Sequence, residues 1–208
     1  MRRGPLGSED GALNCMLSGG YFETSELREM GFAAVGNEVR VSKRVEIPDP
    51  SRIWLGSHVR IDAFVTITIG SSGFVRVGSY THIADRVRLV GSDGIVVGNY
   101  VGLASNVNIL SMSDDYSGSY LVGPMAPLRT TGGTRGRVDL GDHVVVGASS
   151  IIFPGISLGE GVAVGACSLV NRSLPSWGIY FGAPVRFVKK RSKDMLKFLD
   201  EDELMGLQ

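Results

Sequence analysis

The sequence predicts an all-β fold, a parallel β-helix of about six coils, and two repeating features support that prediction. Aliphatic residues recur at every sixth position over most of the chain, and the fifth position of each hexad is nearly always small or β-branched. Two inward-facing positions in six residues correspond to one short strand and one turn. Three such strands close a triangular coil of about eighteen residues, and stacked coils pair their backbones about 4.8 Å apart.

The hexads keep their phase through most of the chain. Residues 140–175 contain six unbroken hexads, so the phase there does not depend on where breaks are placed. The left hand of the coil is taken from known hexad-repeat proteins, because the usual crossover rule would predict a right-handed one. Fifth positions include Val39, Val59, Val144, Ser51, Ser113 and Ser168. The hexads begin at Val35, Val41, Ile47, Leu55, Ile61, Ile67, Val77, Ile83, Leu89, Val97, Leu103, Ile109, Leu140, Val146, Ile152, Leu158, Val164 and Val170.

Four coils contain a strand lengthened by two residues. Alternate residues of a strand face the same side, so the pattern aliphatic, any residue, aliphatic, Gly is typical of such a strand. The pattern occurs at Ile53-Trp54-Leu55-Gly56, Val75-Arg76-Val77-Gly78, Ile95-Val96-Val97-Gly98 and Val138-Asp139-Leu140-Gly141.

The composition fits one compact domain. With 43% hydrophobic residues and 29 glycines among 208, the chain has material for a core and for tight turns. We expect the repeat domain to span residues 21–190, after a disordered or tag-like segment, residues 1–20, and before a C-terminal helix in residues 191–208. Basic and acidic residues balance at 21 each, which disfavours nucleic acid and membrane partners. The lack of an export signal predicts a cytoplasmic protein with Cys15 and Cys167 as free thiols.

The two ends of the coil stack are expected to be covered, because open ends would expose unpaired strand edges. Residues 24–31 are typical of a short helix, with a hydroxyl cap at Thr24 and Gly31 just past its end. Residues 192–204 place apolar side chains at helical spacing among charges, which predicts an amphipathic helix at the other end.

Residues 111–137 are the large interruption of the hexads. They carry Asp114, Asp115, Tyr116, Tyr120, two prolines and several glycines. Long loops in compact repeat proteins are usually functional, so we predict a protruding loop with a role in the site.

Several motifs resemble a known enzyme superfamily. The segments Gly141-Asp142-His143-Val144-Val145-Val146-Gly147-Ala148, Pro154-Gly155-Ile156-Ser157-Leu158-Gly159 and Gly182-Ala183-Pro184-Val185-Arg186 resemble the hexapeptide-repeat acyltransferases. Within that superfamily, Leu110-Ser111-Met112-Ser113-Asp114-Asp115-Tyr116-Ser117-Gly118 and Trp177-Gly178-Ile179-Tyr180-Phe181-Gly182 resemble the enzymes that N-acetylate dTDP-4-amino-4,6-dideoxy-D-glucose for O-antigen synthesis. The resemblance covers residues 21–193.

The resemblance implies a cytoplasmic homotrimer in which acetyl-CoA and a nucleotide-linked amino sugar meet in clefts between neighbouring prisms, without a metal. Its pattern places pantetheine along the last coils, where small residues permit close approach. The cofactor residues that it implies are Gly147, Ala148, Gly165 and Ala166 beside pantetheine, Pro184 at the border, and Arg186, Lys189 and Lys190 near the phosphates. A solvated charge run is the alternative interpretation of the two lysines.

Direct acyl transfer needs a group that takes the proton of the nucleophile and a donor for the developing oxyanion. Related acetyltransferases that act on hydroxyls place a His at the start of the interrupting loop, and the resemblance puts Asp114 at that position. A carboxylate is a weak base for an alcohol, whereas a neutral amine has its own lone pair, so the missing His favours an amine acceptor. Asp114 is therefore the first candidate base, with Asp115 as its assistant. The alternative for both aspartates is a loop-forming role, because Asp often starts a loop through hydrogen bonds from the backbone to its side chain.

His82 is the alternative base. It occupies the sixth position of its hexad, and an imidazole exchanges protons near neutral pH. His58 and His143 occupy turn positions and are expected to be structural.

Three other functions stay open at this point. An O-acetyltransferase would keep the fold but is disfavoured by the missing His. A zinc hydratase of the same fold would need closely spaced histidines, which His58, His82 and His143 are not. A non-catalytic scaffold would not bind CoA.

Overall fold

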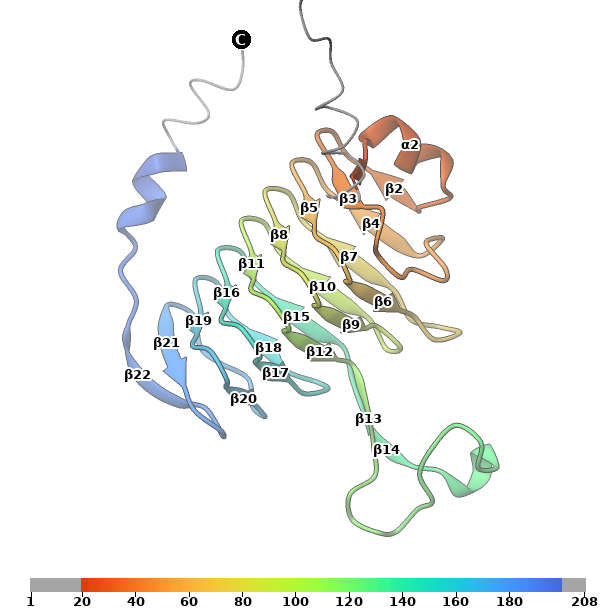
Figure 1. Ribbon diagram of the computed structural model, residues 1–208. Helices are drawn as coiled ribbons and strands as arrows, with labels where there is room; N and C mark the ends of the chain where they lie inside the picture. Colours follow the sequence, from red (N-terminus) through yellow and green to blue (C-terminus); the bar gives the residue numbers. More distant parts are fainter. Residues whose placement is uncertain (1–19, 200–208) are drawn as a thin grey trace, which may run out of the picture.

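Three sheets of mainly parallel strands wind around one aliphatic core in the computed structural model, which describes residues 20–199 (Figure 1). The largest sheet contains, in spatial order, β1 (Tyr21–Phe22), β3 (Arg40–Ser42), β5 (Arg60–Ile61), β8 (His82–Ile83), β11 (Gly102–Leu103), β16 (Val145–Val146), β19 (Ala163–Val164), β21 (Gly178–Phe181) and β22 (Arg186–Lys190). The second contains β18 (Ser157–Leu158), β15 (Val138–Leu140), β10 (Ile95–Val97), β7 (Val75–Val77), β4 (Ile53–Leu55) and β2 (Ala34–Val35). The third contains β20 (Leu169–Val170), β17 (Ile151–Ile152), β12 (Asn108–Leu110), β9 (Arg88–Val90) and β6 (Thr66–Thr68).

The fold is the predicted left-handed β-helix, with about seven turns. In the nine-stranded sheet, β1 and β22 pair antiparallel at the two ends and the strands between them are parallel. The hexads predict about six turns. The additional turn ends in β21, where the buried side chain is Tyr180 rather than an aliphatic residue.

The hexad phase predicts the core well. Ile61, Ile83, Leu103, Val146 and Val164 stand in register on successive coils and are all buried. The first residues of the other hexads are buried too, except for two partly buried ones in the N-terminal coils. Two expected fifth positions do not enter the core, because one lies in an exposed turn and the other has already left the prism on β13; they are Ser51 and Ser113.

All four lengthened strands fall in the six-stranded sheet, as β4, β7, β10 and β15. Ile53, Val75, Ile95 and Val138 are aligned in the strand register, and all four are buried. The two additional residues therefore give each of these strands one further inward-facing aliphatic side chain.

The N-terminal end of the prism is covered by helix α2 (Thr24–Glu29), and Leu27 is its buried residue. The hydroxyl cap expected at Thr24 is wrong. The side chain of Glu23 accepts from the backbone of Glu26 and that of Glu26 from the backbone of Glu23, which makes a capping box. The Thr24 hydroxyl instead accepts a hydrogen bond from the Val39 backbone, which ties the helix to the first coil.

At the other end, the chain turns back as β22 and then forms a 3₁₀ helix, η2 (Asp194–Phe198). This 3₁₀ helix lies within residues 192–204, for which an amphipathic helix was predicted. Residues 200–204 of that prediction, like residues 1–19 with Cys15, lie outside the described residues. Within the described part of the chain, no helix is long and apolar enough to cross a membrane.

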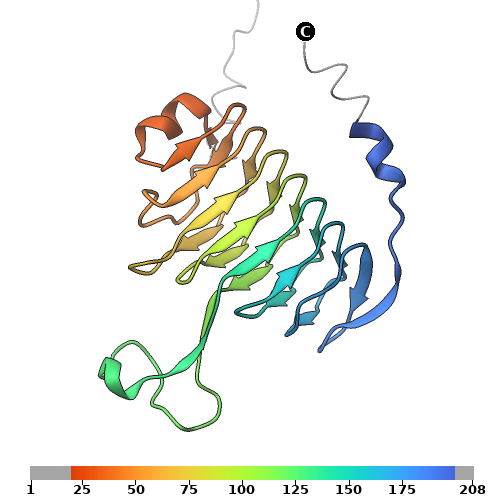
Figure 2. The same cartoon turned by 180° about the vertical axis from the view of Figure 1, so that it is seen from behind.

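Residues 111–137, here called the flap, project from the prism after β12 (Figures 1 and 2). The flap is more ordered than a simple loop. Strand β13 (Met112–Asp114) pairs antiparallel with β14 (Gly133–Arg135), and η1 (Leu128–Thr130) lies in the far part.

Candidate active site

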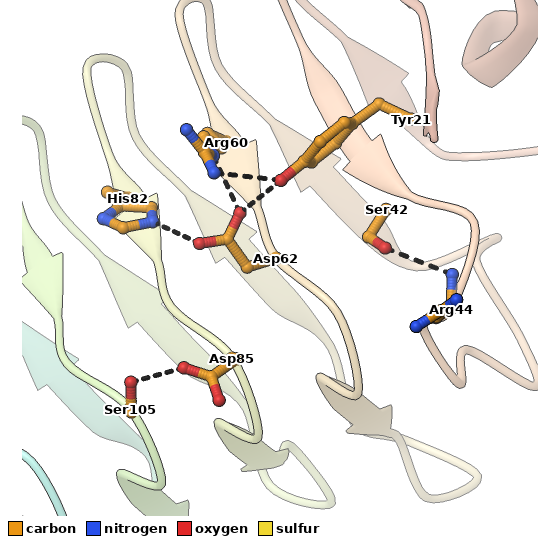
Figure 3. Close-up of polar contacts among 8 residues, drawn as sticks. All are labelled: Tyr21, Ser42, Arg44, Arg60, Asp62, His82, Asp85 and Ser105. Atoms are coloured by element: carbon orange, nitrogen blue, oxygen red, sulfur yellow. Dashed lines mark hydrogen bonds and ion pairs between the residues drawn. The ribbon is translucent and has the colours of Figure 1, made fainter. Parts of the chain in front are cut away.

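One carboxylate on the outer face of the nine-stranded sheet receives three hydrogen bonds (Figure 3). His82 Nε2 lies 2.8 Å from Asp62 Oδ2. The Tyr21 hydroxyl and Arg60 Nε each donate to Asp62 Oδ1 at 2.7 Å. Arg60 also donates to the Tyr21 oxygen at 3.0 Å, so the four side chains form one closed network.

The strand register explains how these residues meet. Arg60 on β5 stands opposite His82 on β8, and Asp62 follows two residues after Arg60, so its side chain reaches both. Tyr21 comes from outside the hexads. Because β1 pairs with β3 at the edge of the sheet, Tyr21 stands opposite Ser42, which occupies in its coil the position that Asp62 has in the next.

The electrostatics of the network favour an ionised carboxylate. Partial burial raises the pKa of Asp62, but the hydrogen bonds from His82, Tyr21 and Arg60 outweigh it and leave the pKa below its ordinary value. Burial and the neighbouring Asp62 carboxylate raise the pKa of Tyr21, which therefore stays a neutral donor at neutral pH. An ionised carboxylate can only accept, so a neutral His82 donates its Nε2 proton and keeps Nδ1 as an acceptor. The His82 side chain is half-exposed, so a ligand can reach it.

The second candidate group lies on the flap. Asp114 is the last residue of β13 and is exposed, and its carboxylate has no hydrogen bond or ion pair within residues 20–199. Asp115, by contrast, accepts from the Ser117 hydroxyl at 2.9 Å and from the backbone N–H groups of Gly118 and Ser119. The hydrogen bond from Ser117 lowers the pKa of Asp115. These contacts are typical of a loop-forming residue, and the assisting role of Asp115 stays a prediction.

The structure does not bring the two groups together within one subunit. His82 lies on β8 in the nine-stranded sheet, whereas the flap leaves from β12 in the five-stranded sheet. In both overall views the flap points away from the body of the prism (Figures 1 and 2).

Two of the predicted cofactor glycines have a packing reason of their own. A Cβ atom on Gly147 would lie 2.4 Å from the backbone nitrogen of Ala166, and one on Gly165 would fall within the ring of Phe181. These glycines therefore let neighbouring coils and Phe181 approach closely. Their contact with a cofactor stays a prediction, as it does for Ala148 and Ala166.

The predicted phosphate-binding residues lie at the C-terminal end of the prism. Pro184 lies in the turn between β21 and β22, and Arg186, Lys189 and Lys190 are exposed on β22. This strand therefore offers three cations along a sheet edge. The arrangement suits the phosphates of a nucleotide.

Comparisons with known proteins identify the family. No family model matches the sequence. The dTDP-4-amino-4,6-dideoxy-D-glucose acyltransferase of Escherichia coli is 33% identical over 177 residues, which cover 85% of this chain and 92% of that protein. This chain belongs to the same acyltransferase family.

Solved structures of this acyltransferase family agree. AntD, an N-acyltransferase from Bacillus cereus in complex with dTDP and 3-hydroxybutyryl-CoA, aligns with a TM-score of 0.86 and 38% identity over 91% of this chain and 99% of that chain. A variant of AntD in complex with dTDP-4-amino-4,6-dideoxyglucose and coenzyme A aligns with a TM-score of 0.84 and 39% identity over 90% and 98%. The likeness confirms the predicted fold and the assignment as an acyl-CoA-dependent N-acyltransferase.

Two histidines of this acyltransferase, His58 and His143, lie outside the network, in a stack along one corner of the prism. His58 stacks on Tyr80 at 4.5 Å between ring centroids, and Tyr80 on Tyr100 at 4.8 Å. Tyr100 stacks on His143 at 5.1 Å. The expected structural role of His58 and His143 fits this stack. No group of three or more potential metal-ligating side chains occurs in the part of the chain that the structure describes.

Sequence reasoning missed Asp62 and Tyr21. Asp62 follows the inward-facing Ile61 directly, and the equivalent positions of the later coils of this sheet are small: Ala84, Ala104, Gly147 and Gly165. A carboxylate at a position that is small in the later coils could therefore have been noticed from the hexad pattern alone. Tyr21 gave no such signal, because it lies outside the repeats. The pair Asp85 and Ser105, joined by a hydrogen bond on the next coils, was missed in the same way (Figure 3).

Proposed function

We propose that this acyltransferase moves the acetyl group of acetyl-CoA to the 4-amine of dTDP-4-amino-4,6-dideoxyglucose, by direct attack of the amine on the thioester. The observation that carries the proposal is the likeness, over nine-tenths of the chain, to an N-acyltransferase structure that holds this sugar and coenzyme A. Because the AntD complex holds 3-hydroxybutyryl-CoA, this larger acyl donor should be tested beside acetyl-CoA.

The exposed carboxylate of Asp114 supports an amine acceptor. A sugar amine arrives largely as an ammonium ion, which an ionised carboxylate attracts and orients. Once the ammonium has lost one proton to a base, its lone pair attacks the carbonyl carbon of the thioester. The tetrahedral intermediate then loses a second proton from nitrogen and expels the CoA thiolate, which takes up a proton and leaves as the thiol. Because no contact within residues 20–199 occupies this carboxylate, Asp114 is available for that task.

His82 supplies a second route for the proton. In the network on β5 and β8, Asp62 orients the imidazole through Nε2, which leaves Nδ1 to accept a proton from the attacking amine. The pH dependence of the rate distinguishes the two candidate bases. An imidazole and a carboxylate become protonated, and so stop accepting a proton, in different pH ranges.

The assembly proposed for this reaction is a homotrimer with the site between neighbouring prisms. The flap supports it, since Met125 is 94% exposed, Leu128 89% and Tyr116 86%. Large apolar side chains are rarely left so exposed without a partner surface. A threefold arrangement that closes into a ring would offer each flap the face of its neighbour. We place the reaction in the cytoplasm, in the synthesis of O-antigen or another surface polysaccharide.

A thiol-release assay tests the proposal. Purified protein is incubated with acetyl-CoA or 3-hydroxybutyryl-CoA and with dTDP-4-amino-4,6-dideoxyglucose, a UDP-linked amino sugar, dTDP-glucose or free galactose. We expect CoA release with the first sugar and little with the two hydroxyl acceptors. Faster release with dTDP-glucose or galactose would contradict the amine assignment and favour O-acetylation.

Three substitutions then assign the base: Asp114→Asn, Asp115→Asn and His82→Ala, with His58→Ala as the matched control. The rate of each variant is measured across pH. A loss of less than about tenfold excludes a residue from that role.

A further inference from the structure

The base of the flap is tied to the preceding coil by a two-pronged ion pair. Arg135 on β14 donates from Nε to Asp93 Oδ2 at 2.9 Å and from Nη2 to Asp93 Oδ1 at 2.7 Å. Asp93 lies between β9 and β10, so the pair joins the flap to a turn one coil away. Paired N–H donors on a carboxylate fix orientation as well as distance. The Asp93 side chain is only 23% exposed, which limits its screening by solvent.

Partly buried hydrogen bonds also hold this turn. Ser111, the first residue of the flap, is fully buried. Its hydroxyl accepts from the Asp93 backbone nitrogen at 2.9 Å and donates to the Val90 carbonyl at 2.7 Å. The backbone nitrogen of Gly136 donates to the Ser111 carbonyl at 3.0 Å, which closes the base of the flap. Asp93 therefore contacts both ends of the flap, Ser111 where the chain leaves the prism and Arg135 where it returns.

The ribbon carries this constraint to Asp114. Arg135 pairs with Met112, and Asp114 pairs with Gly133, two residues further out on the same two strands. The ribbon is closely packed there, because a Cβ atom on Gly133 would lie 2.1 Å from the Ser113 carbonyl oxygen. An orientation fixed at Arg135 is thus passed along two short paired strands to the carboxylate.

We propose that Asp93 and Arg135 are positioning residues for the acyl transfer, which clamp the flap so that Asp114 meets the acceptor amine. The inference rests on the proposed function, because that function gives Asp114 its task. Neither residue of the clamp needs to touch a substrate. A misplacement of a reacting group by about 1 Å is enough to lower a rate by about two orders of magnitude.

A neighbouring ion pair provides a matched control. Arg137 donates to Asp139 at 2.9 Å, and its exposure of 58% is close to the 54% of Arg135. This pair joins two residues of one extended segment, two positions apart, and does not connect the flap to another coil. Its loss therefore removes the same kind of interaction without releasing the flap.

The test compares Asp93→Asn, Arg135→Gln and Arg135→Lys with Asp139→Asn. The readouts are kcat, KM for acetyl-CoA, the pH–rate profile, the midpoint of thermal unfolding, and the rate of tryptic cleavage after the exposed Arg129 of the flap. We expect Asp93→Asn and Arg135→Gln to lower kcat by about tenfold or more while KM for acetyl-CoA stays within about twofold. Cleavage at Arg129 should accelerate, and the shape of the pH profile should not change, because the clamp supplies no proton acceptor.

Arg135→Lys should fall between, because it keeps the charge but loses the two-pronged contact. If Asp93→Asn does not fold, the arginine variants carry the test alone, since Arg135 lies on the exposed flap. A clamp variant that keeps the wild-type kcat overturns the inference, and so does an equal loss in Asp139→Asn. If the wild type turns over none of the amino sugars, the proposed function fails. In that case unchanged cleavage at Arg129 in the clamp variants would still disprove the clamp.

Discussion

His82 and Asp62 lie on adjacent coils, and their side chains meet at 2.8 Å between Nε2 and Oδ2. The same carboxylate is held by Tyr21 and Arg60, so the imidazole cannot turn without breaking this contact. Such a carboxylate–imidazole pair is what general-base catalysis requires, although a structural pair would have the same geometry. The rate of the variants distinguishes the two interpretations.

The first prediction concerns this pair. If His82 takes the proton of the amine, His82→Ala should lower kcat by at least about tenfold and remove the acidic limb of the pH–rate profile. Asp62→Asn should lower kcat by about tenfold to a hundredfold, because the amide no longer fixes the tautomer of His82. His58→Ala, in the aromatic stack, serves as the control. Wild-type rates for His82→Ala across the pH range would assign the network a structural role.

The second prediction concerns the separation of His82 from the flap. If both residues act on one acceptor, they come from different subunits of the proposed trimer. Two inactive proteins, His82→Ala and Asp114→Asn, should then restore activity when they are co-expressed with different tags and purified as mixed assemblies. In a mixed trimer, one of the three sites combines an intact His82 with an intact Asp114, so about a third of the wild-type rate is expected. Mixed assemblies as inactive as their parents would exclude a site shared in this way.

The third prediction tests the packing role of Gly165. Gly165→Ala places a methyl group within the Phe181 ring and should destabilise the protein by about 1–3 kcal/mol. Phe181→Ala in the same chain should recover part of that loss. Gly102→Ala, in the same sheet, is the matched control, because its Cβ atom would lie 3.8 Å from the nearest atom, on Val145. Denaturant unfolding measures all four proteins. Equal stability of Gly165→Ala and Gly102→Ala would disprove the packing role.

The fourth prediction concerns acid stability. The folded pKa of Asp62 lies below its ordinary value, despite partial burial, because of the hydrogen bonds from His82, Tyr21 and Arg60. The stabilisation is therefore complete above the ordinary carboxyl pKa of about 4 and is lost as the pH falls through the folded pKa. Asp62→Asn should lower the midpoint of thermal unfolding at pH 7 and flatten its fall below pH ~4. The exposed Asp194→Asn should follow the wild type. Parallel pH curves for wild type and Asp62→Asn would contradict the electrostatic account.

The sequence predicted the prism because its core obeys one local rule. An inward-facing aliphatic residue at every sixth position fixes both the strand and its neighbours, so columns such as Ile61, Ile83 and Leu103 follow from spacing. The rule fails where the chain leaves the repeat. Nothing in the spacing indicates that Tyr180 closes a further turn or that the flap forms a paired ribbon.

The site was harder to predict because its contacts are between coils. The hexad spacing placed His82 on the surface but did not identify its partner, because Asp62 reaches His82 only through the register of β5 and β8. The link from Asp93 to Arg135 spans 42 residues, and no repeat relates the two. The apparent candidates Gly147 and Gly165 were chosen for their small size, which coil packing explains without a ligand.

The most direct measurement of the central claim is CoA release by the wild-type protein with equal concentrations of dTDP-4-amino-4,6-dideoxyglucose and dTDP-glucose. The two acceptors carry an amine and a hydroxyl, respectively, on the same carbon of the sugar. We expect release with the amino sugar, an N-acylated product by mass spectrometry, and a rate at least about a hundredfold lower with dTDP-glucose. Equal rates with the two acceptors, or release with neither, would contradict the account.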